Sequence, residues 1–403
     1  MNVRHAMLST VRREPTPQIP WVPRMDLWAI GQEARGTLPD RFRGLDVVGI
    51  ARELGVGCHA VRADFTTPSW SQRDPRDFMF RPFGIENHPD FPFRVELNAL
   101  PVDFRYERGR YHTVIHAPAG DVETVMEYSD AMARDAITQP EVIQRVIRAG
   151  DSLEAVAQVY EHFEVVATPA GYWDFHERIG GNGLAIAQGV ISASPIHSML
   201  HQLMDMETFF YWYMDDRDSL YRLGERMTPF YERVLDVLCG SQAEVVLWGA
   251  NYDQSTTWPP FFETEVAPWL ARVGDRLRAA GKLLLSHCDG ENDLLLPLMP
   301  GCRMDIAESV CTQPMTRRTL ADQQAGMGPT TTIWGGLPAV AFMTGAMSDD
   351  AFERHLDGVF EALGAGSRLI LGVSDNVPVD ADLDRIERVS RRVQDFGPVE
   401  PGP

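Results

Sequence analysis

The sequence predicts a mixed α/β fold, namely a (β/α)8 barrel with an N-terminal extension and a β-hairpin insertion. From residue 243 onward, five short apolar runs alternate with amphipathic stretches across short loops. That alternation is typical of parallel strands with helical crossovers. About three more such units fit upstream, which completes the count for a barrel. Polar or aromatic residues follow each of the five strands, as they do where a barrel carries its site.

Composition narrows the class of protein. The 403 residues are 44% hydrophobic and 23% charged, which is typical of a globular protein with a large core. A formal net charge of −20 would repel phosphates, so neither a nucleic acid nor an anionic membrane is an expected partner. Five cysteines without paired C-x-x-C spacing favour reduced thiols and a cytoplasmic location. No signal peptide or membrane span is expected.

The N-terminal half is less regular than the rest. Residues 1–23 are polar and rich in proline, so we expect a surface arm ahead of one domain over residues 24–403. Gly109 separates two alternating runs, which predicts the hairpin. In chain order we expect a helix over 45–54, a strand over 57–65, a loop over 66–95, the hairpin within 96–128, one or two helices over 140–158, strands over 164–168 and 184–192, and helices over 196–214 and 219–238.

The C-terminal half follows the regular pattern. Pro259 and Pro260 mark a helix start, where proline is common. The expected strands cover 243–249, 282–287, 304–309, 330–334 and 368–373, and the expected helices cover 261–280, 292–299, 319–326, 348–365 and 381–396.

The most informative stretch runs from Lys282 to Gly290, where an apolar run ends in His287, Cys288 and Asp289. On an extended chain His287 and Asp289 point to the same side and Cys288 to the other. The pair could bind a metal or move a proton, or it could cap the next helix.

If the barrel forms, the residues after its strands converge at one mouth. A cluster of histidine and carboxylates there suits a divalent metal, or metal-free acid–base work in which crowded carboxylates shift one another's pKa. Polar loop residues are common, so the joint pattern carries more weight than any single member. The converging residues are Asn251, Asp253, His287, Asp289, Glu308, Trp334, Ser374, Asp375 and Asn376.

Other histidines fit structural roles better. His197 and His201 are four residues apart on an expected helix and share a face, but no acid completes a zinc motif. His112 and His116 alternate on the hairpin and are expected to be structural.

Several loose motifs occur in an order that resembles one family. The chain is similar to the uroporphyrinogen decarboxylase superfamily, and resembles its cobalamin- and corrinoid-dependent methyltransferase branch more than the true decarboxylases. The decarboxylases carry two arginines before a Leu-Pro, whereas here only Arg35 precedes Leu38-Pro39. The stretches that carry the resemblance are 22–28, 38–43, 191–195, 259–270, 280–290, 334–338 and 369–378.

The methyltransferase branch binds zinc through H-x-C-G and a distant cysteine. This chain keeps His287 and Gly290, has Asp289 in place of the first cysteine, and has Ser374 or Asp375 near the second. The resemblance therefore implies Zn²⁺ held by His287, Asp289 and Asp375. An oxygen-rich site of this kind suits an oxygen-bearing substrate more than a thiol.

The resemblance implies metal-assisted methyl transfer from a small methylated substrate, such as a methoxylated compound, to a corrinoid on a separate partner protein. His287, Asp375 and Glu308 would act as catalytic groups. The expected substrate-binding residues are Arg24, Asp26, Asn251, Asp253 and Trp334. Family members are often dimers, so a homodimer is also implied. The alternatives are a metal-free decarboxylase or lyase acting on a small carboxylic acid, and a non-catalytic binding barrel.

Overall fold

The computed structural model describes residues 2–66, 73–134, 137, 139–363 and 368–399. Its largest sheet has six parallel strands in the order β12-β11-β10-β9-β8-β7, so the α/β class is confirmed. Neighbours in this sheet are neighbours in sequence, which fits strands joined by helical crossovers. The strands are β7 (Ala187–Gln188), β8 (Val245–Ala250), β9 (Leu283–His287), β10 (Ile306–Val310), β11 (Thr332–Pro338) and β12 (Leu369–Ser374).

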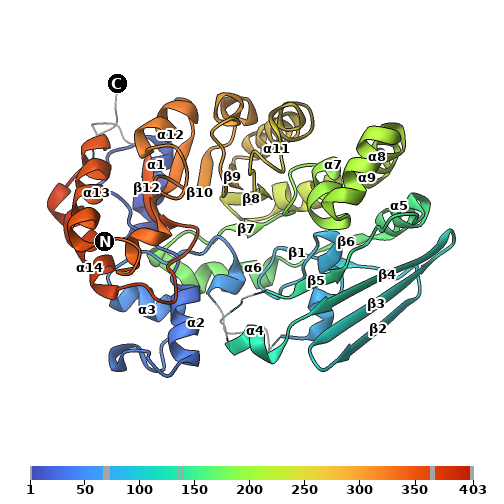
Figure 1. The fold of residues 1–403 in the computed structure, drawn as a ribbon, viewed down its shortest axis with the longest axis horizontal. Coiled ribbons are helices and arrows are strands. Elements are labelled where there is room, and N and C mark those ends of the chain that lie inside the picture. Colours follow the sequence, from blue (N-terminus) through green and yellow to red (C-terminus); the bar gives the residue numbers. More distant parts are fainter. Residues whose placement is uncertain (1, 67–72, 135–136, 138, 364–367, 400–403) are drawn as a thin grey trace.

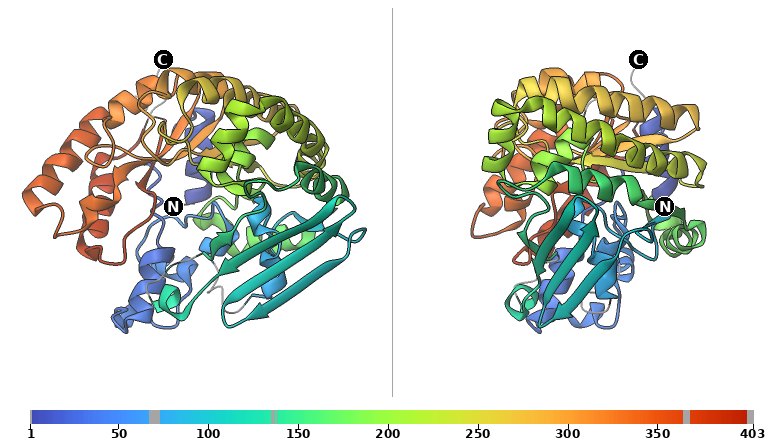
Figure 2. Two further views of the ribbon diagram at one scale, coloured as in Figure 1. Left: turned by 45° about the vertical axis from the view of Figure 1, so that its right-hand side comes forward. Right: turned by 90° about the vertical axis from the view of Figure 1, so that its right-hand side faces the viewer.

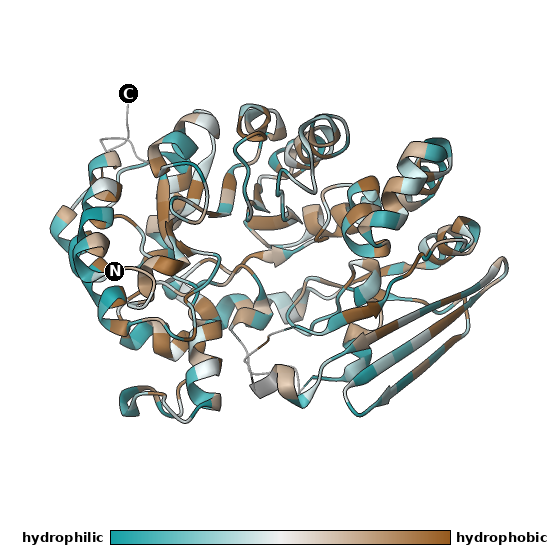
Figure 3. Cartoon of the chain, viewed as in Figure 1, coloured by the Kyte–Doolittle hydropathy of each residue, from teal (hydrophilic) through white to brown (hydrophobic). Residues whose placement is uncertain are grey.

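Helices cover the outside of this sheet (Figure 1). The strands are apolar along their length and the helices expose polar residues on their outer sides (Figure 3), the pattern of strands buried on both faces. The expected helix over 292–299 is instead a 3-10 segment over Leu296–Cys302, which contains Pro297 and Pro300. The helices around the sheet are α9 (Arg217–Gly240), α10 (Pro259–Phe261), α11 (Ala267–Ala279), α12 (Leu320–Gly326), α13 (Asp349–Ala362) and α14 (Leu383–Phe396).

Two extended segments from the N-terminal half adjoin the two edges of the sheet. The N–H of Val22 donates to the carbonyl of Leu371 in β12 at 2.8 Å. The N–H of Gly57 donates to Trp21 at 2.8 Å, which joins the two segments. On the far side, the N–H of Ile186 donates to Ala60 at 3.0 Å. The strand expected over 57–65 is thus an extended segment, and its end forms a short 3-10 turn over Ala63–Phe65.

The expected surface arm over residues 1–23 is wrong. Helix α1 (Val3–Arg12) buries Val3, Met7 and Leu8. These side chains pack in one cluster with apolar residues of the parallel strands, including Leu285 and Ile306. The arm prediction rested on the arginines and prolines of this stretch, whereas burial is decided by the apolar residues that share one face of the helix.

The hairpin expected around Gly109 is present as β2 (Val102–Glu107) and β3 (Arg110–Ala117). It belongs to a four-stranded antiparallel sheet with β4 (Gly120–Glu127) and β5 (Glu141–Gln144), and this sheet projects from the main body (Figure 2). The helix expected from residue 140 is therefore wrong at its start. Glu141–Gln144 pairs with β4, and the helix begins only at α5 (Leu153–His162).

The remaining elements connect these parts. The helix expected over 196–214 is interrupted, because a π-helical turn over Met199–Leu203 is followed by extended backbone at Met204. Residues 67–72 of the expected loop over 66–95 lie outside the described residues. Within the described residues, no helix has the length and apolar character needed to cross a membrane. The other elements are α2 (Asp26–Ala34), α3 (Val47–Glu53), α4 (Asp130–Arg134), α6 (Pro169–Ile179), α7 (Pro195–Ser198), α8 (Met206–Asp215), and the two-stranded sheet of β1 (Phe93–Glu96) and β6 (Glu164–Ala167).

Candidate functional site

The carboxyl ends of three parallel strands bring His287, Glu308 and Asp375 together. His287 ends β9, Glu308 lies in β10, and Asp375 follows β12. The register of β9 and β10 sets His287 directly beside Glu308, and the imidazole Nδ1 lies 2.6 Å from Glu308 Oε2. One ligand atom from each of the three residues lies within 4.8 Å of the others. We call these three residues the His287 cluster.

The cluster has a buried and an accessible side. Glu308 is 2% exposed. The side chains of His287 and Asp375 are 18% and 27% exposed, so a small molecule can reach them. Ligands of open α/β sheets and barrels bind at this end of the strands.

His59 is the functional candidate that the sequence did not reveal. Its Nε2 lies 2.9 Å from Glu308 Oε1, so each oxygen of Glu308 faces one imidazole. The His59 ring also packs on Trp334, with ring centroids 4.7 Å apart. The only available signal was its place in the strand expected over 57–65, and nothing in the sequence linked that strand to Glu308.

Arg24 and Asp26 support Asp375 from the N-terminal segment. The Arg24 guanidinium donates to Asp375 Oδ2 at 2.8 Å and to both oxygens of Asp26 at 2.8 and 3.2 Å. It stacks on the ring of Phe65, 3.5 Å from the ring centroid. Because Arg24 is buried and engaged on all these sides, it fixes the position of the Asp375 carboxylate.

Charges within the cluster shift each pKa. Burial alone would lower the pKa of His287, but the charge and hydrogen bond of Glu308 outweigh burial and raise it to about 9. Burial would raise the pKa of Glu308, yet His287 and His59 lower it to about 2. Arg24 and then His287 likewise outweigh burial and hold the pKa of Asp375 well below its usual range. Without a metal, the cluster is an imidazolium between carboxylates.

The other predicted residues surround this cluster. Asp289 is partly buried and contributes no ligand atom to the group within 4.8 Å. Burial raises the pKa of its carboxyl, and the charge of Asp375 acts in the same direction. Asn251 donates its backbone N–H to the carbonyl of His287 at 3.0 Å. Asp253 accepts the N–H groups of Ser255 and Glu291, which brace two loops.

Trp334 packs against the ring of His59. It is 1% exposed, and its indole N–H donates to the carbonyl of Val22 at 3.2 Å. Its role is therefore to hold the N-terminal segment against β11.

The donor set of the cluster fits a divalent metal. Zn²⁺ takes imidazole nitrogen and carboxylate oxygen at roughly 2.0–2.2 Å, and its catalytic sites use three protein ligands plus an open position. Asp26 balances the charge of Arg24, which leaves Glu308 and Asp375 as two negative charges. A divalent ion with neutral His287 would balance these two charges in place of the imidazole proton.

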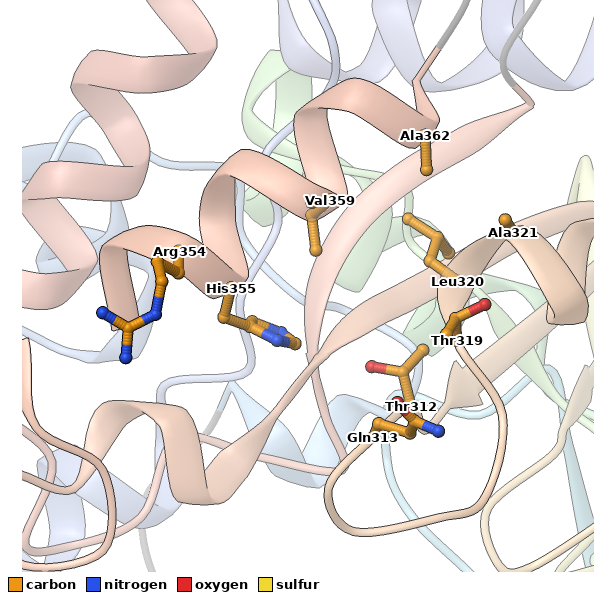
Figure 4. Close-up of a pocket in the computed structure, with 10 residues that line it drawn as sticks. Thr312, Gln313, Thr319, Leu320, Ala321, Arg354, His355, Val359 and Ala362 are labelled. Carbon is orange, nitrogen blue, oxygen red and sulfur yellow. The ribbon is translucent and has the colours of Figure 1, made fainter. Parts of the chain in front are cut away.

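A separate cavity of about 350 Å³ lies between α12 and α13 (Figure 4). His355 and Arg354 contribute to its wall together with apolar side chains such as Leu320 and Val359. None of its lining residues belongs to the His287 cluster. The cavity is therefore not part of the candidate site.

Comparisons with known proteins add a likeness in fold. No family model matches the chain, and no curated protein matches it. Eighteen chains of solved structures do match. One of them is a methyltransferase from Methanosarcina mazei, which is 11% identical in sequence, with 98% of each chain covered and a TM-score of 0.53. At this identity the likeness concerns the fold alone, and it extends over nearly the whole of both chains.

Proposed function

We propose that the chain is a metal-assisted methyltransferase that acts on a small methylated substrate. The observation that carries the proposal is the His287 cluster, because it offers three donors of the types that Zn²⁺ accepts at the ends of parallel strands. The likeness in fold to a methyltransferase from Methanosarcina mazei supports the choice of reaction. A methoxylated compound is the proposed type of methyl donor, and a corrinoid on a separate protein is the proposed acceptor.

We further propose that the fold closes into an eight-stranded barrel. The segments around Trp21 and Cys58 would supply the two strands that the six-stranded sheet lacks. Three backbone hydrogen bonds support this closure. Val22 bonds to Leu371, Gly57 bonds to Trp21, and Ile186 bonds to Ala60. A closed barrel would place His59 and Arg24 at the same mouth as the strand ends.

The residues of the chain have distinct roles in this proposal. His287, Glu308 and Asp375 would hold the metal, which when bound supplies a Lewis acid for the oxygen that carries the methyl group. Arg24 holds Asp375 in place through its hydrogen bond. His59 holds the second oxygen of Glu308, so that Glu308 keeps one orientation toward His287.

The first experiment measures metal content by elemental analysis of protein purified without a His-tag. We expect about one zinc per chain in the wild type. Its loss is expected in His287→Ala, Glu308→Gln and Asp375→Asn. Asp289→Asn is the matched variant. If it retains the metal, Glu308 is favoured as the third ligand. If it loses the metal, the ligand set of His287, Asp289 and Asp375 that the resemblance implies is favoured. A wild-type protein without stoichiometric metal would contradict the proposal.

Activity then tests the reaction. A metal-loaded wild type should transfer methyl groups from some methoxylated or methylamine-type compound to a free corrinoid, detected by the change in corrinoid absorbance. Glu308→Gln should lose this transfer together with its metal, whereas Asp289→Asn should keep both. Transfer that persists in metal-free protein would contradict metal assistance.

One observation favours a second candidate, a metal-free decarboxylase or lyase acting on a small carboxylic acid. With a pKa of about 9, His287 carries a proton at neutral pH and could donate it to a carbanion-like product, while ionised Asp375 serves as the partner base. Loss of carbon dioxide from a panel of small acids, abolished in His287→Ala and unaffected by chelator, would support this reading over methyl transfer.

A further inference from the structure

Strand β2 has an open edge. It lies at one end of the order β2-β3-β4-β5, and Figure 1 shows it as the outermost strand, away from α5. No strand among the described residues pairs with its outer side. Natural edge strands are usually protected by charged side chains, above all Lys, or by Pro, a bulge or a covering element. Between Val102 and Glu107 there is no Lys or Pro, the register with β3 is unbroken, and the charged residues Asp103, Arg105 and Glu107 alternate in sign.

The hydrogen bonds to β3 identify which backbone groups face outward. The N–H of His116 donates to the carbonyl of Pro101 at 3.0 Å. Facing residues of antiparallel strands alternate between hydrogen-bonded and non-hydrogen-bonded pairs. The odd-numbered residues of β2 therefore direct their N–H and C=O groups toward β3. Val102, Phe104 and Tyr106 direct theirs toward solvent.

We propose that a second copy of this chain pairs with β2 in antiparallel fashion, about a two-fold axis at Phe104. In this register Phe104 faces Phe104 of the second copy, and Val102 faces Tyr106. The outward N–H and C=O groups then meet as hydrogen-bonded pairs. Asp103 faces Arg105 of the second copy, and the symmetry repeats this ion pair.

Charge complementarity selects this register over its neighbours. A shift of two residues in one direction sets Arg105 opposite Arg105 of the second copy. A shift in the other direction sets Asp103 opposite Asp103. Like charges directly opposite each other across strands are destabilising, whereas opposite charges stabilise the pair. Compared with the registers shifted by two residues in either direction, this register alone sets opposite charges face to face.

The two faces of β2 suit the same arrangement. Phe104 and Tyr106 share a face with the buried Thr113 and Tyr111 of β3, yet Tyr106 is 48% exposed. A second β2 would extend this face and cover Tyr106. Asp103 and Arg105 lie on the opposite, exposed face, where an ion pair keeps contact with water.

The test is sedimentation equilibrium on the full chain over a concentration series. The wild type should approach twice the chain mass of 45.2 kDa. Asp103→Arg alone and Arg105→Asp alone each set like charges opposite each other, so each should weaken the dimer by about tenfold or more. Both side chains are exposed, so neither variant disturbs the core. Asp103→Arg also removes the contact of Asp103 Oδ2 with His116 Nε2 at 3.1 Å, whereas Arg105→Asp leaves that contact in place.

An equimolar mixture of the two variants restores both ion pairs between unlike chains and should recover dimer. Glu123→Arg is the matched control, because it changes a charge on the same sheet in β4, away from the edge, and should leave the dimer intact. A monomeric wild type overturns the proposal. A dimer that resists both single variants, or a mixture that fails to recover, also overturns it.

Discussion

Two buried histidines, His88 and His197, and the partly buried His201 make stability depend on pH. Burial, reinforced by the charge of Arg73, lowers the pKa of His88 to about 4. Burial, together with the charge of Arg145, also lowers the pKa of His201 to about 4. Burial also lowers the pKa of His197 well below its usual range, and the charge of His201 lowers it further. In the unfolded chain each imidazole has a pKa of about 6.5.

The sign of the effect follows from proton uptake. Between pH 6.5 and 4 the unfolded chain binds protons that the folded chain excludes, so stability falls as pH falls. Each histidine contributes up to about 1.4 kcal/mol per pH unit. His201→Gln keeps a donor or acceptor for Thr257, which lies 3.1 Å from the imidazole, and removes one titrating group. We expect urea unfolding at pH 7, 6 and 5 to show a shallower loss of stability in this variant. Equal slopes for variant and wild type would contradict the lowered pKa of His201 in the folded chain.

At the scale of elements, α1 contributes to the core of the parallel strands. Met7 is fully buried in the cluster that also holds Leu285 and Ile306. Met7→Ala should therefore lower the free energy of unfolding by about 2–5 kcal/mol, measured by denaturant titration. Arg12→Ala is the control, since Arg12 is exposed on the same helix and should change stability by less than about 0.5 kcal/mol. Similar values for the two variants would show that α1 does not pack as described.

The sequence predicted elements well where local pattern decides them. The five C-terminal strands appear within a few residues of their expected positions, because each is a continuous apolar run between turn residues. The residues from Glu141 are compatible with a helix, but pairing with β4 overrides that local preference. In α1, Val3, Met7 and Thr10 recur at helical spacing on one buried side, a pattern that the polar and proline-rich composition of residues 1–23 hides.

At the scale of the whole molecule, the candidate site joins distant parts of the chain. His287, Glu308 and Asp375 could be expected together because parallel strands end at one side. No pattern in the sequence indicates the contacts that form only when distant segments of the chain pack together. The bond from Arg24 to Asp375 spans 351 positions, and the contact of His59 with Glu308 spans 249. Sequence spacing cannot reveal such pairs, because loop lengths do not specify which segments meet.

The pairing of the N-terminal segment with β12 predicts that the two segments are protected from hydrogen exchange together. The N–H of Leu371 donates to Pro20 and that of Val22 donates to Leu371, both at 2.8 Å, so neither bond can open without separating the N-terminal segment from β12. We expect peptides covering the two segments to exchange through one opening, with opening free energies within about 1 kcal/mol of each other.

Met7→Ala should lower both opening free energies together, because α1 and Val22 pack in the same cluster as Ile370 of β12. Mass spectrometry of wild type and variant after timed deuteration measures this. If the peptide around Val22 exchanged freely while β12 stayed protected, the N-terminal segment would be only peripherally attached. The support that Arg24 gives to Asp375 would then be lost for much of the time, since Arg24 lies two residues after Val22 on the same segment.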